Sequence, residues 1–323
     1  MRIALVILNW NTRGQLARWL PSLISGCEGL DAKVIVADNA STDGSMQMLT
    51  ENFPQIRQIV LDRNYGFTGG YNRALERVEA EYYVLVNSDI EVSVGWLSPL
   101  VDWMDGHPEC GICGPKLLSM KDPEYFEYAG AAGGLIDRFG FPFCRGRVLG
   151  QLEKDLGQYD TPGEVSWVSG ACLMIRSSLW KEMGGLDDRF FAHMEEIDLC
   201  WRVRAAGYTV NVIPQSSVRH LGGGTLPQSS PFKLFLNYRN NLLMLDNNLP
   251  EGLRYRITVR RILDICLAFA YICCGKVESA KAVFRAHKEY RALRRPFSPE
   301  GKVNILSGKL LAFEYLRIKF KKK

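Results

Sequence analysis

The sequence predicts an α/β protein with a mostly parallel, doubly wound central sheet and a basic helical extension at the C-terminal end. Three observations lead to this fold class. Apolar runs rich in β-branched residues recur at a spacing of roughly 25 residues in the first third of the chain. Each of these runs ends at an Asn or an Asp. The last quarter of the chain differs, because it combines helical periodicity with a strong positive charge.

The apolar runs are predicted to be central strands. They cover residues 2–8, 34–37, 58–61 and 82–86. None of them alternates apolar with polar side chains, so each strand is expected to be covered on both faces, as in parallel sheets. The helices predicted between them cover residues 14–25, 45–52 and 69–79.

The middle of the chain, around residues 110–170, is richer in glycine and is expected to be loop-like. The elements expected after it are an apolar segment over residues 166–176, a short helix near 179–183, an acidic helix start within the segment 190–204, and a strand over 208–213 that ends at Pro214. These elements are expected to complete the α/β domain.

Composition excludes several classes of protein. The chain has 323 residues, of which 47% are hydrophobic and 23% charged, so it is neither disordered nor collagen-like nor a polytopic membrane protein. The first apolar run passes into Asn9 without a cleavage pattern, so no secretion signal is expected. The nine cysteines are scattered in apolar stretches, and the Cys110/Cys113 pair has no second pair to complete a zinc site. A reducing, cytoplasmic location is therefore expected.

The C-terminal region carries an unusual charge. Residues 251–323 contain 18 Lys and Arg but 6 Asp and Glu, a balance of +12, whereas the rest of the chain has −7. Such a region favours an anionic partner, a membrane surface in preference to a nucleic acid, although a solvated basic face remains the alternative. No nucleic-acid motif accompanies the charge, so no nucleic-acid partner is expected.

The pattern inside this region favours the membrane surface. Residues 262–274 are apolar except for Asp264 but are fewer than the roughly 20 needed to span a bilayer. Apolar residues also share one helical face beyond position 280, namely Val283, Ala286, Tyr290 and Leu293, with basic residues around them. With Lys319–Lys323 adding charge, attachment at the inner face of the cytoplasmic membrane is predicted. The alternatives are that these helices pack on the rest of the protein or form a homodimer.

Polar residues follow each predicted strand. They are Asn9 and Asn11, Asp38 and Asn39, residues 64–70, and Asn87-Ser88-Asp89. In open α/β sheets, ligands bind outside the carboxyl ends of the strands. One polar strand end is explained by a turn or a helix cap, but four in succession predict a binding crevice.

Two common nucleotide-binding motifs are missing from the sequence, which excludes two ways of holding a nucleotide. Neither the Gly-x-Gly-x-x-Gly of dinucleotide-binding proteins nor a phosphate-binding P-loop follows the first strand. A nucleotide would be held differently here, with Asp38 accepting from a base or ribose. A divalent cation on Asp89 would bridge two phosphates in place of a glycine-rich loop.

Two further groups of residues carry side chains suited to catalysis or to metal binding. Glu195, Glu196 and Asp198 crowd the first turn of a predicted helix, where the helix dipole alone is one explanation. Burial and like charge would instead raise a carboxylate pKa and produce a general base. His220 precedes the glycine run 222–224 and is either structural, a metal ligand, or in contact with a phosphate.

Together these segments resemble family 2 glycosyltransferases, especially their rhamnosyltransferase-like branch. Residues 36–45 resemble the nucleotide-binding segment of that family, and Asn64–Asn72 matches its Asn-x-Gly-Phe-x-x-Gly-x-Asn pattern. Asn87-Ser88-Asp89 stands at the place of the Asp-x-Asp metal motif. The segments that correspond to its acceptor and base region are 170–176, 184–187 and 190–202. The resemblance extends over about residues 1–245, including Asn237–Asn240. It implies a GT-A fold, a nucleotide-sugar donor, a divalent cation (Mg²⁺ or Mn²⁺) and inversion at the anomeric carbon.

The resemblance assigns roles to individual residues. Those implied to bind the donor are Asn9, Asn11, Asp38, Asn39, Asn64, Gly66, Phe67, Asn72, Asn87 and Ser88. Asp89 and His220 are implied to hold the metal, and Glu196 is implied to be the base, with Glu195 and Asp198 beside it. The chain departs from the family at Asn87, where an Asp is usual, and at Glu196, where the motif is usually Glu-Asp. The extra methylene shifts the carboxylate by roughly 1.5 Å, so Glu195 remains a rival.

The function predicted in this way is the inverting transfer of a sugar from a dTDP-rhamnose-like or UDP-sugar donor to a hydroxyl of a glycan or lipid-linked acceptor, in polysaccharide biosynthesis. Residues 1–248 are expected to be the catalytic domain, with a donor half (1–110) and an acceptor half (111–248), followed by the basic region 249–323. An inactive glycan- or membrane-binding relative is an alternative. A sugar nucleotidyltransferase is another, but residues 9–15 lack its glycine-rich loop.

Overall fold

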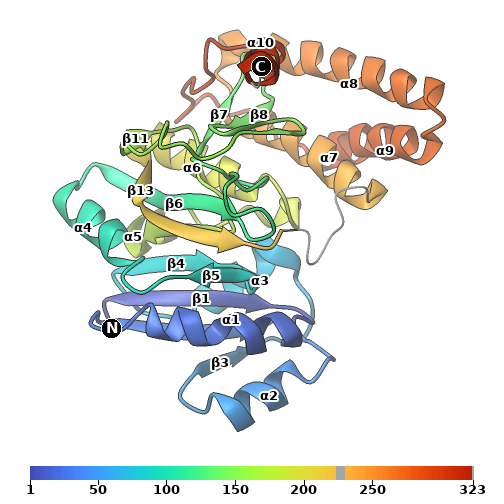
Figure 1. The fold of residues 1–323 in the computed structure, drawn as a ribbon. Coiled ribbons are helices and arrows are strands. Elements are labelled where there is room, and N and C mark those ends of the chain that lie inside the picture. The colour runs from blue at the N-terminus through green and yellow to red at the C-terminus, as the bar shows by residue number, and fades with distance from the viewer. Residues whose placement is uncertain (223–229, 322–323) are drawn as a thin grey trace.

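The computed structural model describes residues 1–222 and 230–321. It shows a central sheet between two layers of helices, with a helical extension at one end (Figure 1). The predicted α/β fold class with its C-terminal helical region is confirmed. Gly223, Gly224, Lys322 and Lys323, which entered the sequence-based predictions, lie outside the described residues.

Within the described residues, nine strands form the main sheet in the order β11-β13-β6-β12-β4-β1-β2-β3, with β5 paired to β13. Their bounds are β1 (Ile3–Asn9), β2 (Ala32–Asp38), β3 (Arg57–Val60), β4 (Tyr82–Val86), β5 (Ile90–Val92), β6 (Cys110–Ser119), β11 (Gly163–Glu164), β12 (Cys172–Arg176) and β13 (Thr209–His220). A small second sheet contains β7 (Gly134–Ile136), β8 (Pro142–Cys144), β9 (Arg147–Val148) and β10 (Gln151–Leu152).

The strands β3, β2, β1 and β4 are parallel neighbours, as the unbroken apolar runs predict. Their register pairs Asn9 with Asp38, so the polar ends of β1 and β2 lie at one edge of the sheet. Strand β12 inserts antiparallel between β4 and β6, and β13 runs parallel to β6. The sheet is therefore mixed, and the half formed by β3, β2, β1 and β4 is parallel.

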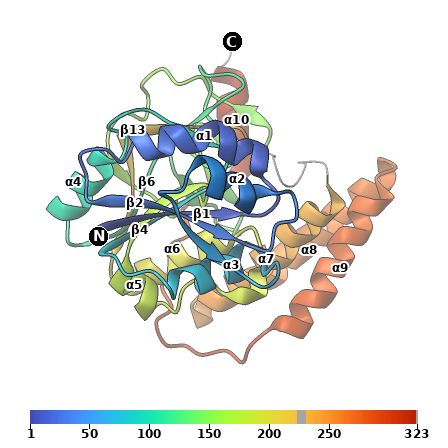
Figure 2. The ribbon, with the colours of Figure 1, turned by 90° about the horizontal axis from the view of Figure 1, so that it is seen from below.

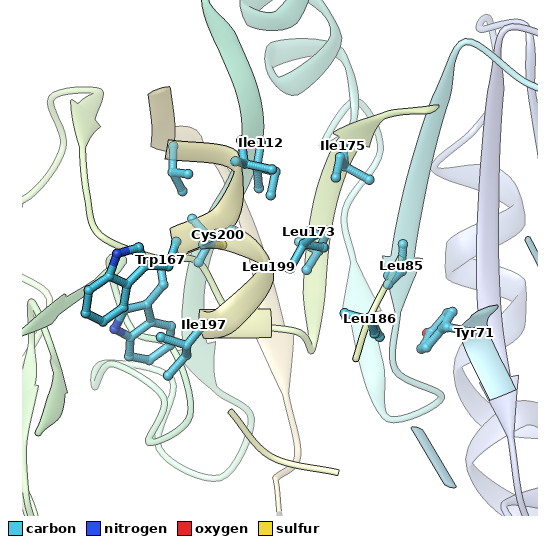
Figure 3. Packing of buried hydrophobic residues seen from close by; sticks show 14 of the residues in the cluster. Tyr71, Leu85, Ile112, Trp167, Leu173, Ile175, Leu186, Ile197, Leu199 and Cys200 are labelled. Carbon is cyan, nitrogen blue, oxygen red and sulfur yellow. The ribbon is translucent and has the colours of Figure 1, made fainter. Parts of the chain in front are cut away.

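Helices cover both faces of the sheet, because successive residues of each strand point to opposite sides. Ile3, Leu5 and Ile7 pack with α1 (Arg13–Ser25), α2 (Ser45–Asn52) and α4 (Ser98–Gly106). Ala4 and Val6 face the other layer, which contains α3 (Gly66–Leu75), α5 (Ser177–Glu182), α6 (Glu195–Ala205) and α7 (Pro231–Asn248). Figure 3 shows part of that second layer, where residues of α6 pack beside β12 and Trp167.

Several boundaries differ from those predicted. Helix α3 starts at Gly66 and ends at Leu75, and the strand of the 166–176 segment begins only at Cys172. Strand β13 does not stop at Pro214 but continues to His220, because the pairing with β6 shifts register between Ile213 and Ser217. Such an irregularity accommodates a proline, which cannot donate a ladder hydrogen bond. The glycine-rich middle is more ordered than expected, since it forms β6 and the small sheet.

The C-terminal region forms α8 (Tyr255–Cys273), α9 (Val277–Leu293) and α10 (Leu311–Lys321). The predicted apolar face of α9 is real, but it is buried: Val283 and Ala286 pack in a cluster with Phe235 and Leu236 of α7. This face therefore holds the helix on the protein and is not available to a membrane. Helix α10 packs on the small sheet through Ile318. In the part of the chain that the structure describes, no helix is long and apolar enough to cross a membrane.

A buried ion network fastens this extension to the rest of the protein. Asp264 of α8 is fully buried; its carboxylate accepts from Arg260 Nε at 2.7 Å and lies 3.3 Å from His287 Nε2 of α9. Arg260 also donates to Asn241 of α7. Asp264→Ala is expected to lower the free energy of unfolding by about 3–5 kcal/mol, because it leaves a buried guanidinium unpaired. Urea denaturation measures this loss.

The matched control removes an exposed ion pair on α9. Lys281 Nζ lies 2.8 Å from Glu278, and both side chains are mostly exposed. Lys281→Ala should change the free energy of unfolding by less than about 1 kcal/mol. Equal effects of Asp264→Ala and Lys281→Ala would contradict the structural role given to the network.

Candidate active site

A cavity of about 400 Å³ opens at the carboxyl ends of β1, β2 and β4, where the sequence predicts a binding crevice. The starts of α6 and α7 close its other side. The predicted site residues that line it are Asn39, Asn64, Gly66, Phe67, Asn87, Ser88, Asp89, Glu195, Glu196 and His220. The strand-end residues and the acidic helix start, far apart in the sequence, therefore share one cavity.

Three of the predicted donor-binding residues, Asn9, Asn11 and Asp38, are not among the cavity-lining residues. Asn9 Nδ2 donates to Asp38 Oδ1 at 2.7 Å, and Asp38 Oδ2 accepts from the backbone N–H of Ser41 at 2.9 Å. Asn11 has a left-handed backbone (φ 55°), and its Oδ1 accepts from the Thr42 N–H at 2.7 Å. These side chains hold the loops after β1 and β2 together at the rim of the cavity.

Local contacts explain why the Asn64–Phe67 segment contains these residue types. Asn39 Nδ2 donates to Asn64 Oδ1 and to the Gly66 carbonyl, both at 2.9 Å, which fixes the turn into α3. Gly66 has φ +71°, and a Cβ on it would lie 2.5 Å from the ring of Phe191, so only glycine fits. Phe67 contacts Tyr71 edge-on, with ring centroids 4.7 Å apart. The motif thus shapes the cavity floor and brings Phe191 over it.

Asn72 and Asp198 also lie outside the cavity lining. Asn72 makes a two-way bridge to Leu186, donating to its carbonyl at 2.7 Å and accepting from its N–H at 2.9 Å. The fully buried Asp198 accepts from Arg202 Nε at 2.8 Å and from Asn248 Nδ2 at 2.7 Å. Asn72 joins α3 to the segment before α6, and Asp198 joins α6 to α7. Both therefore hold the elements that carry the cavity residues.

Asp89 and His220 face each other across the cavity wall. Asp89 follows β4 and His220 ends β13; His220 Nε2 is 3.1 Å from Asp89 Oδ1, and His220 Nδ1 is 3.4 Å from Glu127 Oε1. Burial lowers the pKa of His220, but hydrogen bonds and charge from Asp89 and Glu127 outweigh it and raise the pKa to about 10. In this state the imidazolium balances two buried carboxylates.

This pair also suits a divalent cation once His220 loses its proton, because only a neutral imidazole has a lone pair for a metal. Neighbouring ligands of an octahedral Mg²⁺ or Mn²⁺ are about 3 Å apart, the separation that Asp89 Oδ1 and His220 Nε2 have. Among residues 1–222 and 230–321, no group of three or more His, Cys, Asp or Glu is arranged to hold a metal. Two protein ligands leave positions for phosphate oxygens and water, which is how Mg²⁺ binds with nucleotides. The residues present fit the cation that the resemblance implies.

Glu195 and Glu196 start α6 and line the cavity, and one carboxylate oxygen of each is buried without a hydrogen-bond partner. Burial raises the pKa of Glu196 to about 7, although nearby backbone N–H groups, including that of Gly170, oppose the shift. Burial, together with the negative charge of Glu196, raises the pKa of Glu195 well above its ordinary value. At neutral pH the Glu196 carboxylate is thus available to accept a proton, while the upward pKa shift of Glu195 favours its protonated form.

The cavity contains residues that the sequence analysis missed. Glu127, Tyr128, His193, Phe232 and Lys233 line it. Glu127 comes from the glycine-rich middle, where no periodicity marks it. A signal existed for His193, which lies two residues before Glu195 at the acidic helix start. Phe191, His193 and Met194 all have left-handed backbones, with φ of 63°, 69° and 72°, a strained conformation of the kind often found at functional sites.

The fold and the cavity together define an α/β protein with a polar cavity at its strand ends and two buried carboxylates on the facing helix. The sequence profile of "Glycosyl transferase family 2" matches residues 4–182, more than half of the chain. The chain therefore belongs to glycosyl transferase family 2 and is a glycosyltransferase.

Comparison with known proteins agrees. The chain is 27% identical over 236 residues to the N-acetylglucosaminyl-diphospho-decaprenol L-rhamnosyltransferase of Mycobacterium tuberculosis strain H37Rv, covering 68% of this chain and 75% of that one. Its fold is similar to GalNAc-T7, crystallised with UDP, GalNAc and Mn²⁺ (TM-score 0.62, 16% identity, 78% of this chain and 48% of that one). It is also similar to the mannosyltransferase PcManGT of Pyrobaculum calidifontis, crystallised with GDP-Man and Mn²⁺ (TM-score 0.55, 14% identity, 99% and 80%). The GT-A fold is thereby confirmed.

Proposed function

We propose that this enzyme transfers a sugar from a nucleotide-sugar donor to an acceptor hydroxyl in one inverting displacement. The observation that carries the proposal is the single cavity in which Glu196, with its pKa near neutrality, and the Asp89–His220 pair occur together. One group accepts a proton from the acceptor, and the other side of the cavity holds the departing diphosphate. Residues 1–110 serve the donor and residues 111–248 the acceptor, with 249–323 as an additional helical region.

The reaction follows from the side chains. Glu196 accepts the proton of the acceptor hydroxyl as that oxygen attacks the anomeric carbon, and the bond to the nucleotide diphosphate breaks on the opposite face. Asp89 and His220 would hold Mg²⁺ or Mn²⁺, and a cation bound there would supply Lewis-acid stabilisation of the leaving diphosphate. The buried Asp198 holds α6 in place through Arg202 and Asn248. The phenyl rings of Phe67 and Phe191 cover the sugar site and exclude water.

The acceptor we propose is a lipid-linked glycan, and the donor a dTDP-rhamnose-like or UDP-linked sugar. The support is the relative in M. tuberculosis, whose name describes L-rhamnosyl transfer to N-acetylglucosaminyl-diphospho-decaprenol. A role in polysaccharide biosynthesis at the inner face of the cytoplasmic membrane accords with such an acceptor.

The pH dependence of the reaction reports on Glu196. Since the pKa of its carboxyl is about 7, kcat/KM should rise about tenfold per pH unit below pH 7 and level off above it. The value of kcat/KM increases with pH because only the ionised carboxylate accepts a proton. Initial rates from pH 5.5 to 9 measure the profile. A rate that is flat down to pH 5.5 would remove Glu196 from the role of base.

Donor choice is tested with a panel of nucleotide sugars. Calorimetric binding of dTDP-rhamnose and of UDP- and GDP-sugars is measured with Mn²⁺, with Mg²⁺ and with EDTA. The proposal expects one donor to bind far more tightly with the cation than with EDTA. If no donor binds to the folded enzyme under any of these conditions, the proposed function is wrong.

A further inference from the structure

The helical hairpin formed by α8 and α9 has an apolar surface that the protein leaves uncovered. The two helices lie side by side at the edge of the molecule, next to α7 (Figures 1 and 2). Between residues 262 and 275, the one charged residue is Asp264, and it is fully buried. The exposed surface of this half of α8 therefore carries no charged side chain.

Large side chains stand out from this surface. Ile262 is 56% exposed, Phe269 58% and Ile272 43% on α8, and Phe284 is 44% exposed on α9. The ring centroids of Phe269 and Phe284 are 6.4 Å apart. The two helices therefore contribute to one continuous patch, which we term the hairpin patch. Exposed Cys266, Cys273 and Cys274 extend it. Contiguous apolar surfaces of this kind mark interaction sites.

Cations border the hairpin patch along α9. Exposed basic residues there are Lys276, Lys281, Arg285, Lys288 and Arg291. The two acidic residues of α9 are already engaged, Glu278 by Lys281 and Glu289 by Arg285 and Arg239. An apolar stripe beside a basic stripe fits the interface of a bilayer with anionic headgroups. A second copy fits less well, because a two-fold contact would bring the same cations against each other.

The hairpin patch is also connected to the active site. Ala268 of α8 and Val283 of α9 pack with Phe235 and Leu236 of α7, and Ala192, which lines the cavity, packs against this cluster. The first turn of α7 contributes Phe232 and Lys233 to the cavity. The buried side of the hairpin therefore packs against elements that line the cavity.

We propose that the hairpin patch docks the enzyme on an anionic lipid surface and so presents the cavity to an acceptor held in that surface. The docking surface is different from the one that the sequence pattern of α9 predicts, since Val283 and Ala286 are buried. The part of the proposal that concerns the acceptor rests on the proposed function, whereas the docking itself does not.

The three exposed cysteines allow a direct test, because the other six cysteines are buried. An environment-sensitive fluorophore attached to the native enzyme would report from the hairpin patch. Vesicles of phosphatidylcholine with phosphatidylglycerol should shift its emission to the blue, and pure phosphatidylcholine vesicles should do so much less. The absence of a shift with anionic vesicles would overturn the proposal.

Variants identify the surface. The double variant Phe269→Ser with Ile272→Ser should bind anionic vesicles at least about tenfold more weakly in co-sedimentation. Lys276→Gln and Lys288→Gln should each weaken binding about fivefold and reduce its salt dependence. The matched control is Val94→Ser with Leu156→Ser, two residues of similar character that are 81% and 82% exposed on other elements. Equal binding by the Phe269/Ile272 variant and the control would overturn the proposal.

The same variants separate the alternatives. Light scattering should show that the wild type is not a dimer held together through the hairpin patch. A wild-type dimer that dissociates in the Phe269→Ser/Ile272→Ser variant, without vesicle binding, would assign the hairpin patch to a second copy and overturn the proposal. The vesicle assays contain neither donor nor acceptor. Donor hydrolysis without vesicles should be the same in this variant and in the wild type, so a failure of docking is distinguishable from a failure of the proposed function.

Discussion

Glu196→Gln is expected to lower kcat by about 10²–10⁴-fold while nucleotide-sugar binding stays within about twofold of the wild type. The reason is that an amide of nearly the same shape cannot accept the proton of the attacking hydroxyl, and general-base catalysis contributes a factor of this size. Because the Glu196 carboxyl is ionised at high pH in a buried position, its replacement should also stabilise the fold above pH 7. Stopped-time transfer assays and calorimetry measure the first effect, and thermal unfolding at pH 8 the second.

Glu195→Gln is the matched control for this experiment. Burial and the neighbouring carboxylate raise the pKa of Glu195, which favours its protonated form, and a neutral amide resembles that form. We expect this variant to retain at least about a tenth of the wild-type rate, because no proton transfer is assigned to it. Full activity of Glu196→Gln together with an inactive Glu195→Gln would move the base by one residue.

Asp89→Asn is expected to lower kcat/KM on the order of 10²–10³-fold and to abolish the dependence of nucleotide binding on Mn²⁺. Asp89 supplies the charged oxygen of the Asp89–His220 pair, since Asn87 stands where the family usually has an Asp. Titration calorimetry of the nucleoside diphosphate with and without Mn²⁺ measures the effect independently of turnover. EDTA should reduce the wild type to the level of the variant.

Glu91→Gln controls for the loss of a nearby carboxylate. Glu91 lies two residues beyond Asp89, is partly exposed, and pairs at 3.8 Å with Arg219. Its replacement should leave metal-dependent binding unchanged. Metal-independent binding by wild type and Asp89→Asn alike would contradict the cation site while leaving the nucleotide site in place.

The donor side of the cavity was predictable from the sequence for a physical reason. Parallel strands bring their carboxyl ends to one edge, so Asn39, Asn64 and Asp89 had to come together once the apolar runs were identified as strands. The acidic start of α6 was also identifiable, because three carboxylates within four positions are unusual. Which of them face the cavity depends on helix rotation and packing, and Asp198 instead pairs with Arg202.

The parts of the site and the fold that were not predictable depend on contacts between segments far apart in the sequence. Glu127 reaches His220 because the middle segment pairs with β6, the neighbour of β13, and no local periodicity encodes that contact. In the same way, the amphipathic pattern of α9 predicted an apolar helix face, but it did not predict which surface packs against that face. The structure shows that α7 covers it, and the exposed apolar surface lies instead on the outer side of α8.

Stereochemistry of donor hydrolysis tests the central claim most directly, because water then replaces the acceptor and no acceptor has to be identified. Proton NMR records the first anomer released from the preferred nucleotide sugar before mutarotation. A single displacement assisted by Glu196 predicts the anomer opposite in configuration to that of the donor. Release of the same configuration would require two successive displacements and would contradict the mechanism.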